Sequence, residues 1–98
     1  MNLLEGASAT GEWFPLEITG SNRFSLIRTF YAWGTFGGTT VGLEVSPDGG
    51  TTSFAVGDMN GNAIALTSKD VANVIARATH VRATITGGAG MSINARLF

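Results

Sequence analysis

The stretch Thr40-Val41-Gly42-Leu43-Glu44-Val45-Ser46-Pro47-Asp48-Gly49-Gly50 decides the fold class. Its first half is apolar at every second position from Val41 to Val45, and this period of two indicates a β-strand with one buried face. Its second half is a turn, because proline presets the first corner and glycine accepts a positive φ. A strand followed by such a turn predicts a hairpin that returns along Ser53–Val56.

Two further runs, Thr79–Thr86 and Met91–Phe98, alternate in the same way. The residues predicted to face inward are Val81, Ala83, Ile85, Met91, Ile93, Ala95 and Leu97. Glycine-rich Gly87–Gly90 lies between the two runs, which predicts a second hairpin.

The run Ser25–Trp33 is apolar on both faces. One face carries Leu26, Phe30 and Ala32, and the other carries Ile27, Tyr31 and Trp33. Such a run is either a central strand covered on both sides or a strand whose outer face meets a partner. Phe30 is expected in the core, and Gly34–Gly38 joins this run to the Val41 strand.

Three weaker segments complete the pattern. Trp13–Ile18 is a short strand that Pro15 restricts to an edge or a bulge. Asp58–Asn62 is a turn. Thr67–Ala76 is a capped helical start, a strand rich in β-branched residues, or a single helical turn that leads into a strand. The sequence predicts one domain over residues 1–98. Its six to eight short strands predict an all-β antiparallel sandwich that is jelly-roll-like.

The composition excludes several functional classes. The 98 residues include no cysteine and one histidine, so thiol chemistry and cysteine-ligated zinc are excluded. The net charge of −1 argues against a surface that tracks phosphates. No apolar run reaches the roughly 20 residues of a membrane span, and Met1–Glu5 lacks a secretory signal, so synthesis in the cytoplasm is expected. Charged residues make up only 13%, which favours a surface that docks onto other protein.

No catalytic constellation emerges from the motifs. Asp58–Asn62 fails the calcium-loop spacing, and the glycine clusters lack the residues of a phosphate cradle. The chain has no nucleophile elbow, and His80 on an outward strand position beside Arg82 is expected to be a surface residue. Three carboxylates, Glu12, Glu17 and Glu44, are available for a glycosidase pair, but a sandwich this small offers little cleft. We therefore predict no enzyme, no cofactor and no metal site.

Aromatic and arginine side chains supply the candidate contact residues. The aromatics in the first forty residues are either core or a binding patch, and arginines on separate strands favour docking through carboxylates of a protein partner. The candidate interface residues are Trp13, Arg28, Tyr31, Trp33, Phe36, Arg82 and Arg96.

Two segments carry a family resemblance. Thr35-Phe36-Gly37-Gly38-Thr39-Thr40-Val41-Gly42-Leu43-Glu44-Val45-Ser46-Pro47-Asp48-Gly49-Gly50 resembles a segment of small β-sandwich virion proteins of tailed bacteriophages. The end of the chain, Val81–Leu97, is similar to the end of the same proteins. A tryptophan that often follows Gly-Gly-Thr-Thr in them is replaced here by Ser53 and Phe54.

The resemblance implies a function. These virion proteins include capsid decoration (cement) proteins, head-fibre bases and tail-associated modules. The expectation is a non-enzymatic protein on the capsid exterior, bound to the major capsid protein as a homo-oligomer (dimer or trimer), with no nucleic acid and no membrane as partners. The alternative is a receptor- or carbohydrate-binding module of a tail or head fibre, which requires an exposed tryptophan on a flat face.

Overall fold

A computed structural model describes residues 1–16 and 27–98, and this part of the chain forms β-strands and loops without a helix. Its eight strands are β1 (Asn2–Ala7), β2 (Phe14–Pro15), β3 (Ile27–Thr35), β4 (Thr40–Ser46), β5 (Phe54–Ala55), β6 (Asp70–Ile75), β7 (His80–Thr86) and β8 (Ser92–Leu97). None of the described residues belongs to a helix long and apolar enough to cross a membrane. Four residues named in the predictions above, Glu17, Ile18, Ser25 and Leu26, lie outside the described ranges.

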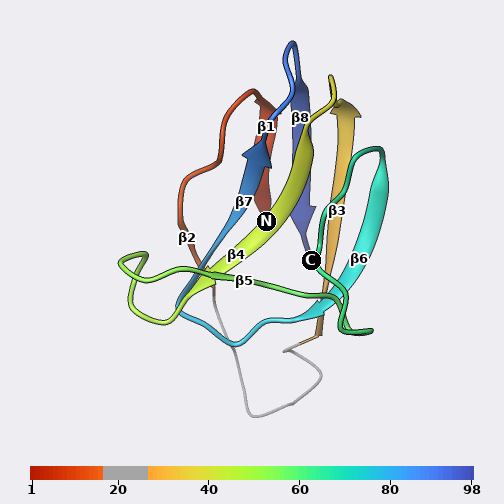
Figure 1. Ribbon diagram of the computed structural model, residues 1–98. Coiled ribbons are helices and arrows are strands. Elements are labelled where there is room, and N and C mark those ends of the chain that lie inside the picture. Colours follow the sequence, from red (N-terminus) through yellow and green to blue (C-terminus); the bar gives the residue numbers. More distant parts are fainter. Residues whose placement is uncertain (17–26) are drawn as a thin grey trace.

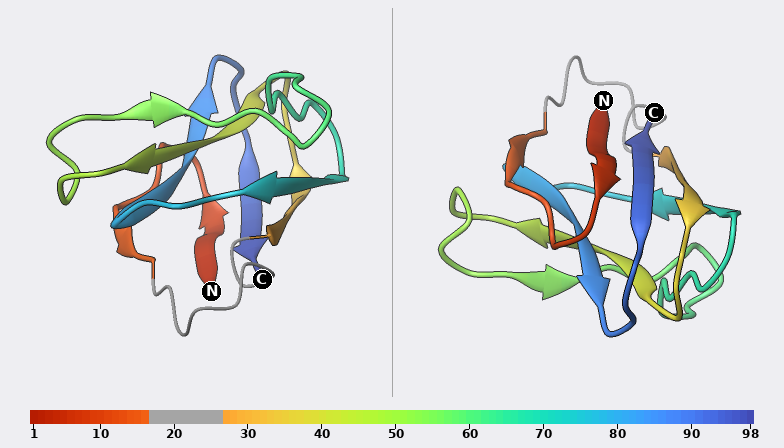
Figure 2. Two further views of the ribbon diagram at one scale, coloured as in Figure 1. Left: turned by 90° about the horizontal axis from the view of Figure 1, so that it is seen from below. Right: turned by 90° about the horizontal axis from the view of Figure 1, so that it is seen from above.

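The strands form two antiparallel sheets of four, in the orders β1-β8-β3-β6 and β2-β7-β4-β5 (Figures 1 and 2). The first strand pairs with the last, the second with the seventh, the third with the sixth and the fourth with the fifth. The chain is thus one long hairpin that has been wrapped into two sheets, which is the jelly-roll arrangement. The prediction of an all-β, jelly-roll-like sandwich of six to eight strands is confirmed.

The local predictions around β4 are also confirmed. β4 returns into β5 with Val45 opposite Phe54, so the proline-glycine turn does close a hairpin. Asp58–Asn62 is a turn whose ends are joined by a bridge between Gly57 and Ala63. Pro15 lies in β2, an edge strand, where its missing N–H leaves no gap in the interior of a sheet.

The ambiguous segment Thr67–Ala76 resolves as a strand. β6 pairs with β3 without a break over six residues, from Ile27 opposite Ile75 to Ala32 opposite Asp70. Its β-branched residues suit this position, because such side chains pack well on a pleated surface. The alternative of a helical start is wrong.

The second predicted hairpin is wrong, because Gly87–Gly90 connects β7 in one sheet to β8 in the other. Gly34–Gly38 makes the same crossing from β3 to β4, and the two connections pack against each other: the Ala89 N–H donates to the Gly37 carbonyl oxygen at 3.0 Å. A Cβ on Gly88 would lie 2.6 Å from the backbone nitrogen of Thr39. These glycines therefore permit the close approach of two sheet-to-sheet connections.

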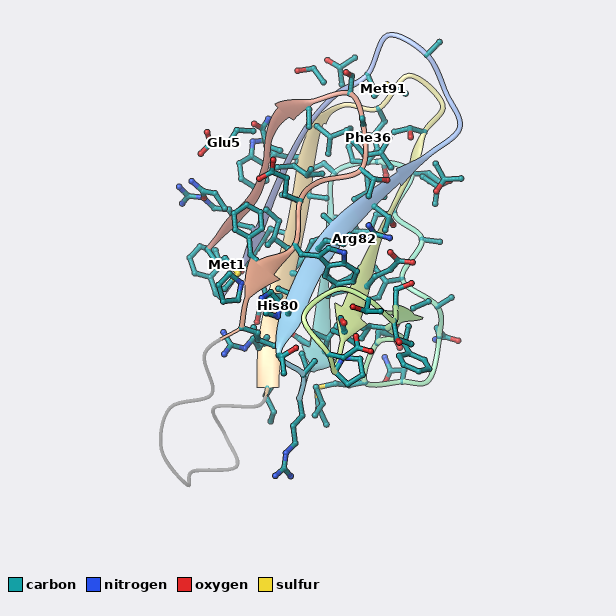
Figure 3. All side chains as sticks on the ribbon, turned by 90° about the vertical axis from the view of Figure 1, so that its left-hand side faces the viewer. Met1, Glu5, Phe36, His80, Arg82 and Met91 are labelled. Carbon is teal, nitrogen blue, oxygen red and sulfur yellow. The ribbon has the colours of Figure 1, made fainter. Side chains whose placement is uncertain are left out.

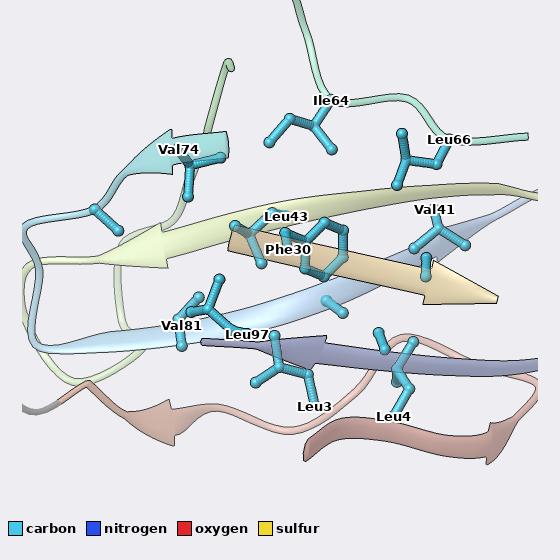
Figure 4. Packing of buried hydrophobic residues seen from close by; sticks show 14 of the residues in the cluster. Leu3, Leu4, Phe30, Val41, Leu43, Ile64, Leu66, Val74, Val81 and Leu97 are labelled. Atoms are coloured by element: carbon cyan, nitrogen blue, oxygen red, sulfur yellow. The ribbon is translucent and has the colours of Figure 1, made fainter. Parts of the chain in front are cut away.

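The core lies between the sheets (Figure 4). Phe30 is fully buried at its centre, as predicted. The predicted inward residues on β4, β7 and β8 are buried or half-buried, namely Val41, Leu43, Val45, Val81, Ala83, Ile85, Met91, Ile93, Ala95 and Leu97. Leu3 and Leu4 close the core from β1, while Ile64 and Leu66 from the β5–β6 connection cover its other side. This core fixes which side of β3 faces outward.

Candidate functional site

The outer face of the β1-β8-β3-β6 sheet gathers most of the exposed apolar side chains. The exposed large apolar residues of the described chain number nine, and six of them lie on this face, with 38% to 61% of each side chain accessible. These six are Ile27, Tyr31, Trp33, Val71, Ile75 and Phe98. We call them the apolar face.

Strand register explains why these residues meet. Residues directly opposite in an antiparallel pair share one face of the sheet. Tyr31 of β3 is opposite Arg96 of β8 and also opposite Val71 of β6. Trp33 is opposite Asn94, and Ile27 is opposite Ile75. Tyr31, Trp33, Val71 and Phe98 therefore lie close together, whereas the hydrogen-bonded pair of Thr29 and Asn73 separates Ile27 and Ile75 from Tyr31 and Val71 on the same side of the sheet.

Aromatic contacts shape one end of the apolar face. The rings of Tyr31 and Phe98 meet edge to face, with centroids 5.6 Å apart and planes at 86°. Together with Trp33 and Arg96 they line a shallow hollow. A second hollow lies between Tyr31, Trp33 and Val71, with Lys69 and Asp70 at its rim. The apolar face thus carries two shallow hollows that are lined by aromatic side chains.

Trp13 and Arg82 lie on the other sheet, away from the apolar face. The Arg82 guanidinium carbon is 4.5 Å from the centre of the Trp13 ring, and its Nε and Nη2 each lie 2.7 Å from Oε1 of Glu44. The Trp13 ring also packs on the proline-glycine turn, since a Cβ on Gly50 would lie 2.8 Å from its Cδ1. The cluster anchors the segment before β2 and the β4–β5 turn to β7.

The remaining candidate interface residues lie elsewhere. Phe36 is half-buried in the β3–β4 connection and packs against the core, near Met91 (Figure 3). Arg28 is half-buried near the start of β3. Of the seven residues proposed from sequence, the structure brings Tyr31, Trp33 and Arg96 together and separates the other four from them.

Sequence reasoning missed four members of the apolar face as contact residues: Ile27, Val71, Ile75 and Phe98. Alternation placed Ile27 with Tyr31 and Trp33, and it placed Phe98 on the outward side of its run. Nothing in the alternation specified that β8 and β6 flank β3. Their side chains are brought together by register between segments far apart in the chain.

His80 and the carboxylate of the β4–β5 turn, Asp48, are engaged in structural hydrogen bonds. The Nδ1 atom of His80 lies 3.1 Å from the Thr79 hydroxyl. The Asp48 carboxylate accepts hydrogen bonds from the Thr52 hydroxyl at 2.7 Å, the Thr52 N–H at 2.8 Å and the Ser46 hydroxyl at 2.8 Å. These bonds, the Thr52 hydroxyl first, lower the pKa of Asp48. They hold the β4–β5 turn closed.

Metal-binding groups do not gather in the described ranges, where no three His, Cys, Asp or Glu side chains are placed to share an ion. Of the three carboxylates considered for a glycosidase pair, Glu44 is bound to Arg82, Glu12 is exposed, and Glu17 lies outside the described residues. The apolar face is therefore the most developed surface feature of the described chain.

Comparison with known proteins identifies no relative of this chain. The chain matches no protein-family model, no curated protein and no solved structure.

Proposed function

We propose that this protein is a non-enzymatic structural protein of a tailed-phage virion, a capsid decoration (cement) protein that binds the outer surface of the shell. The observation that carries the proposal is the apolar face: six large apolar side chains exposed on one side of one sheet. Exposed apolar side chains concentrated on one side of a sheet in this way mark a site of protein contact.

The extent of the apolar face matches what protein docking requires. Six side chains that each expose roughly half of about 150–200 Å² offer roughly 500 Å² of apolar surface. A standard interface buries about 800 Å² on each partner, a little over half of it apolar. The apolar face alone thus supplies the apolar share of one such interface.

Two further observations support the virion setting. Jelly rolls are used by viral capsid and lectin domains, although a fold alone does not define a function. The segments Thr35–Gly50 and Val81–Leu97 resemble small virion proteins of tailed phages. Contacts that exist only in the assembled shell stabilise it by linkage, and a dimer or trimer presents several faces to the shell at once.

Co-sedimentation with purified capsids tests the proposal. We expect saturable binding of the wild-type protein and loss of binding in the variant Trp33→Ser/Val71→Ser. The matched control is Phe54→Ser, because Phe54 is also a large exposed residue (56%) but lies on the other sheet. Far-ultraviolet circular dichroism verifies that each variant is folded. A wild-type protein that stays in the supernatant at every concentration refutes the proposal.

The second candidate function is a receptor- or carbohydrate-binding module, and the exposure of Trp33 favours it. Trp33 and Tyr31 stand on a flat sheet face beside the Asn94 amide and the Arg96 guanidinium. Aromatic faces with adjacent polar groups suit sugar rings. Titration with glycans, followed by tryptophan fluorescence, distinguishes the two functions. If the protein binds glycans through this face, the fluorescence change comes from Trp33 and is absent in the Trp33→Phe variant, in which Trp13 is the remaining tryptophan.

A further inference from the structure

Arg96 lies on the outer sheet face, near the end of β8. It lies opposite Tyr31 on one neighbouring strand and opposite Asn2 on the other. The hollow beside it is lined by the rings of Tyr31, Trp33 and Phe98. The Arg96 guanidinium is therefore presented beside three aromatic rings on the outer face of the sheet.

In the described part of the chain, the Arg96 guanidinium has no carboxylate within 4.0 Å. The ion pair found there within 4.0 Å is that of Arg82 with Glu44. Glu5 lines a hollow together with Arg96 but forms no ion pair with it, and its Oε1 accepts a hydrogen bond at 2.7 Å from the Asn2 side-chain amide. Arg96 is exposed, so water solvates it while the face is open.

The other sheet contains a comparable arginine whose site includes a carboxylate. There the Arg82 guanidinium lies on the Trp13 ring and binds the Glu44 carboxylate. Arginine, aromatic ring and carboxylate form a favourable set, because the planar guanidinium stacks on the ring while its N–H groups bind the carboxylate. Arg96 has the rings beside it and lacks the carboxylate.

We propose that the partner supplies that carboxylate: an Asp or Glu side chain, surrounded by apolar residues on the shell protein, enters the hollow and binds Arg96. This inference rests on the proposed docking function and assigns the chemistry of its contact. Covering the apolar face removes water from the pair, so its contribution exceeds that of an exposed ion pair. An uncompensated Arg96 would oppose docking, since burial of an unpaired charge is costly.

Charge also disfavours two other occupants. A second copy stacked on this face about a two-fold axis near Arg96 would bring two like charges together, which is unfavourable. A nucleic acid requires several cations along its backbone, whereas the apolar face encloses this one arginine with Lys69 at the rim. A protein partner that presents one carboxylate among apolar residues is the occupant that fits.

Substitution of Arg96 tests the inference in the capsid-binding assay. We expect Arg96→Gln to weaken binding to capsids at least tenfold. Arg96→Lys should weaken binding less than Arg96→Gln does, because lysine keeps the charge but not the two-pronged geometry. The matched control is Arg77→Gln, which removes an exposed arginine from the β6–β7 connection and should leave binding unchanged. Wild-type binding should also weaken with rising salt.

Zero-length carbodiimide coupling of the R96K variant to capsids identifies the occupant. The expected product joins position 96 to an Asp or Glu of the shell protein. A crosslink to a second copy of this chain overturns the inference, as does a fluorescence response to an acidic sugar that requires Arg96. If the wild-type protein and the Arg96→Gln variant bind capsids equally tightly, this inference alone is overturned. If the wild-type protein does not bind capsids, the proposed function is overturned as well.

Discussion

Replacing Gly88 by alanine is expected to be among the most destabilising changes of a single methyl group in this fold. Gly88 has φ of +75°, and an added Cβ would lie 2.6 Å from the Thr39 nitrogen and 2.9 Å from the Gly37 carbonyl oxygen. The neighbouring Gly87 has nearly the same φ, +72°, but its Cβ would meet nothing within 4 Å. The two alanine variants therefore share the backbone strain and differ only in the collision.

The two contributions can be estimated separately. A left-handed backbone costs a residue with a Cβ about 1–2 kcal/mol relative to glycine. Forcing an extra carbon into a packed region costs a further 1–3 kcal/mol or so. The atoms around Gly88 belong to backbone and cannot rotate away, which favours the upper part of that range. We expect Gly87→Ala to lose about 1 kcal/mol and Gly88→Ala about 4 kcal/mol of unfolding free energy.

Thermal and urea unfolding of both variants, followed by tryptophan fluorescence, measure this difference. For a domain of this size each kcal/mol lowers Tm by about 4–8 °C, so Gly88→Ala should melt well over 10 °C below Gly87→Ala. Equal losses in the two variants would refute the reasoning, because they would show that the two sheet-to-sheet connections can separate without cost.

Three further predictions follow from the core, the turn and the arginine cluster. Phe30→Ala leaves a cavity at the fully buried centre and should cost about 3–5 kcal/mol in urea unfolding, while Phe30→Leu should cost much less. The pKa of Asp48 is lowered by hydrogen bonds from Thr52, so the charged form stabilises the fold above the ordinary pKa of 3.8, and that stabilisation disappears as the pH falls through the lowered value. Asp48→Asn should thus reduce Tm at neutral pH, and its difference from wild type should close in acid; a difference that is constant with pH contradicts the assignment. Arg82→Lys loses the contact with the Trp13 ring and one of two hydrogen bonds to a carboxylate, and we expect a cost of about 1 kcal/mol, measured as a shift in the urea midpoint at constant slope.

Alternation predicted the strands around Val41, Val81 and Ile93 with the correct faces inward, because a period of two is a local property of the chain. Pairing partners are not local. Gly87–Gly90 has the composition of a hairpin turn, yet the same composition serves a crossing between sheets. Only the packing of that connection on Gly37 distinguishes the two cases.

The candidate site was predicted in part for the same reason. The two-faced apolar run at β3 placed Tyr31 and Trp33 on one face and left open whether a partner or the protein covers it. The structure leaves that face open in the single chain. Val71 and Phe98 joined the face through register with β3, which alternation within a segment does not specify. Trp13 and Arg82, in contrast, have each other and Glu44 as partners.

The pairing of β1 with β8 has a consequence for how the molecule is made. Backbone hydrogen bonds join Met1 to Leu97, and in the described chain the neighbour of β1 in its sheet is β8. During synthesis the first strand must remain without this neighbour until the last one has left the ribosome, whereas β4 and β5 can pair as soon as their turn emerges. Contacts between such distant segments also slow folding, because the entropy of closing the long loop is lost before the contacts form. The fold is therefore expected to close from the β4–β5 hairpin outward, and β1 and β8 pair last.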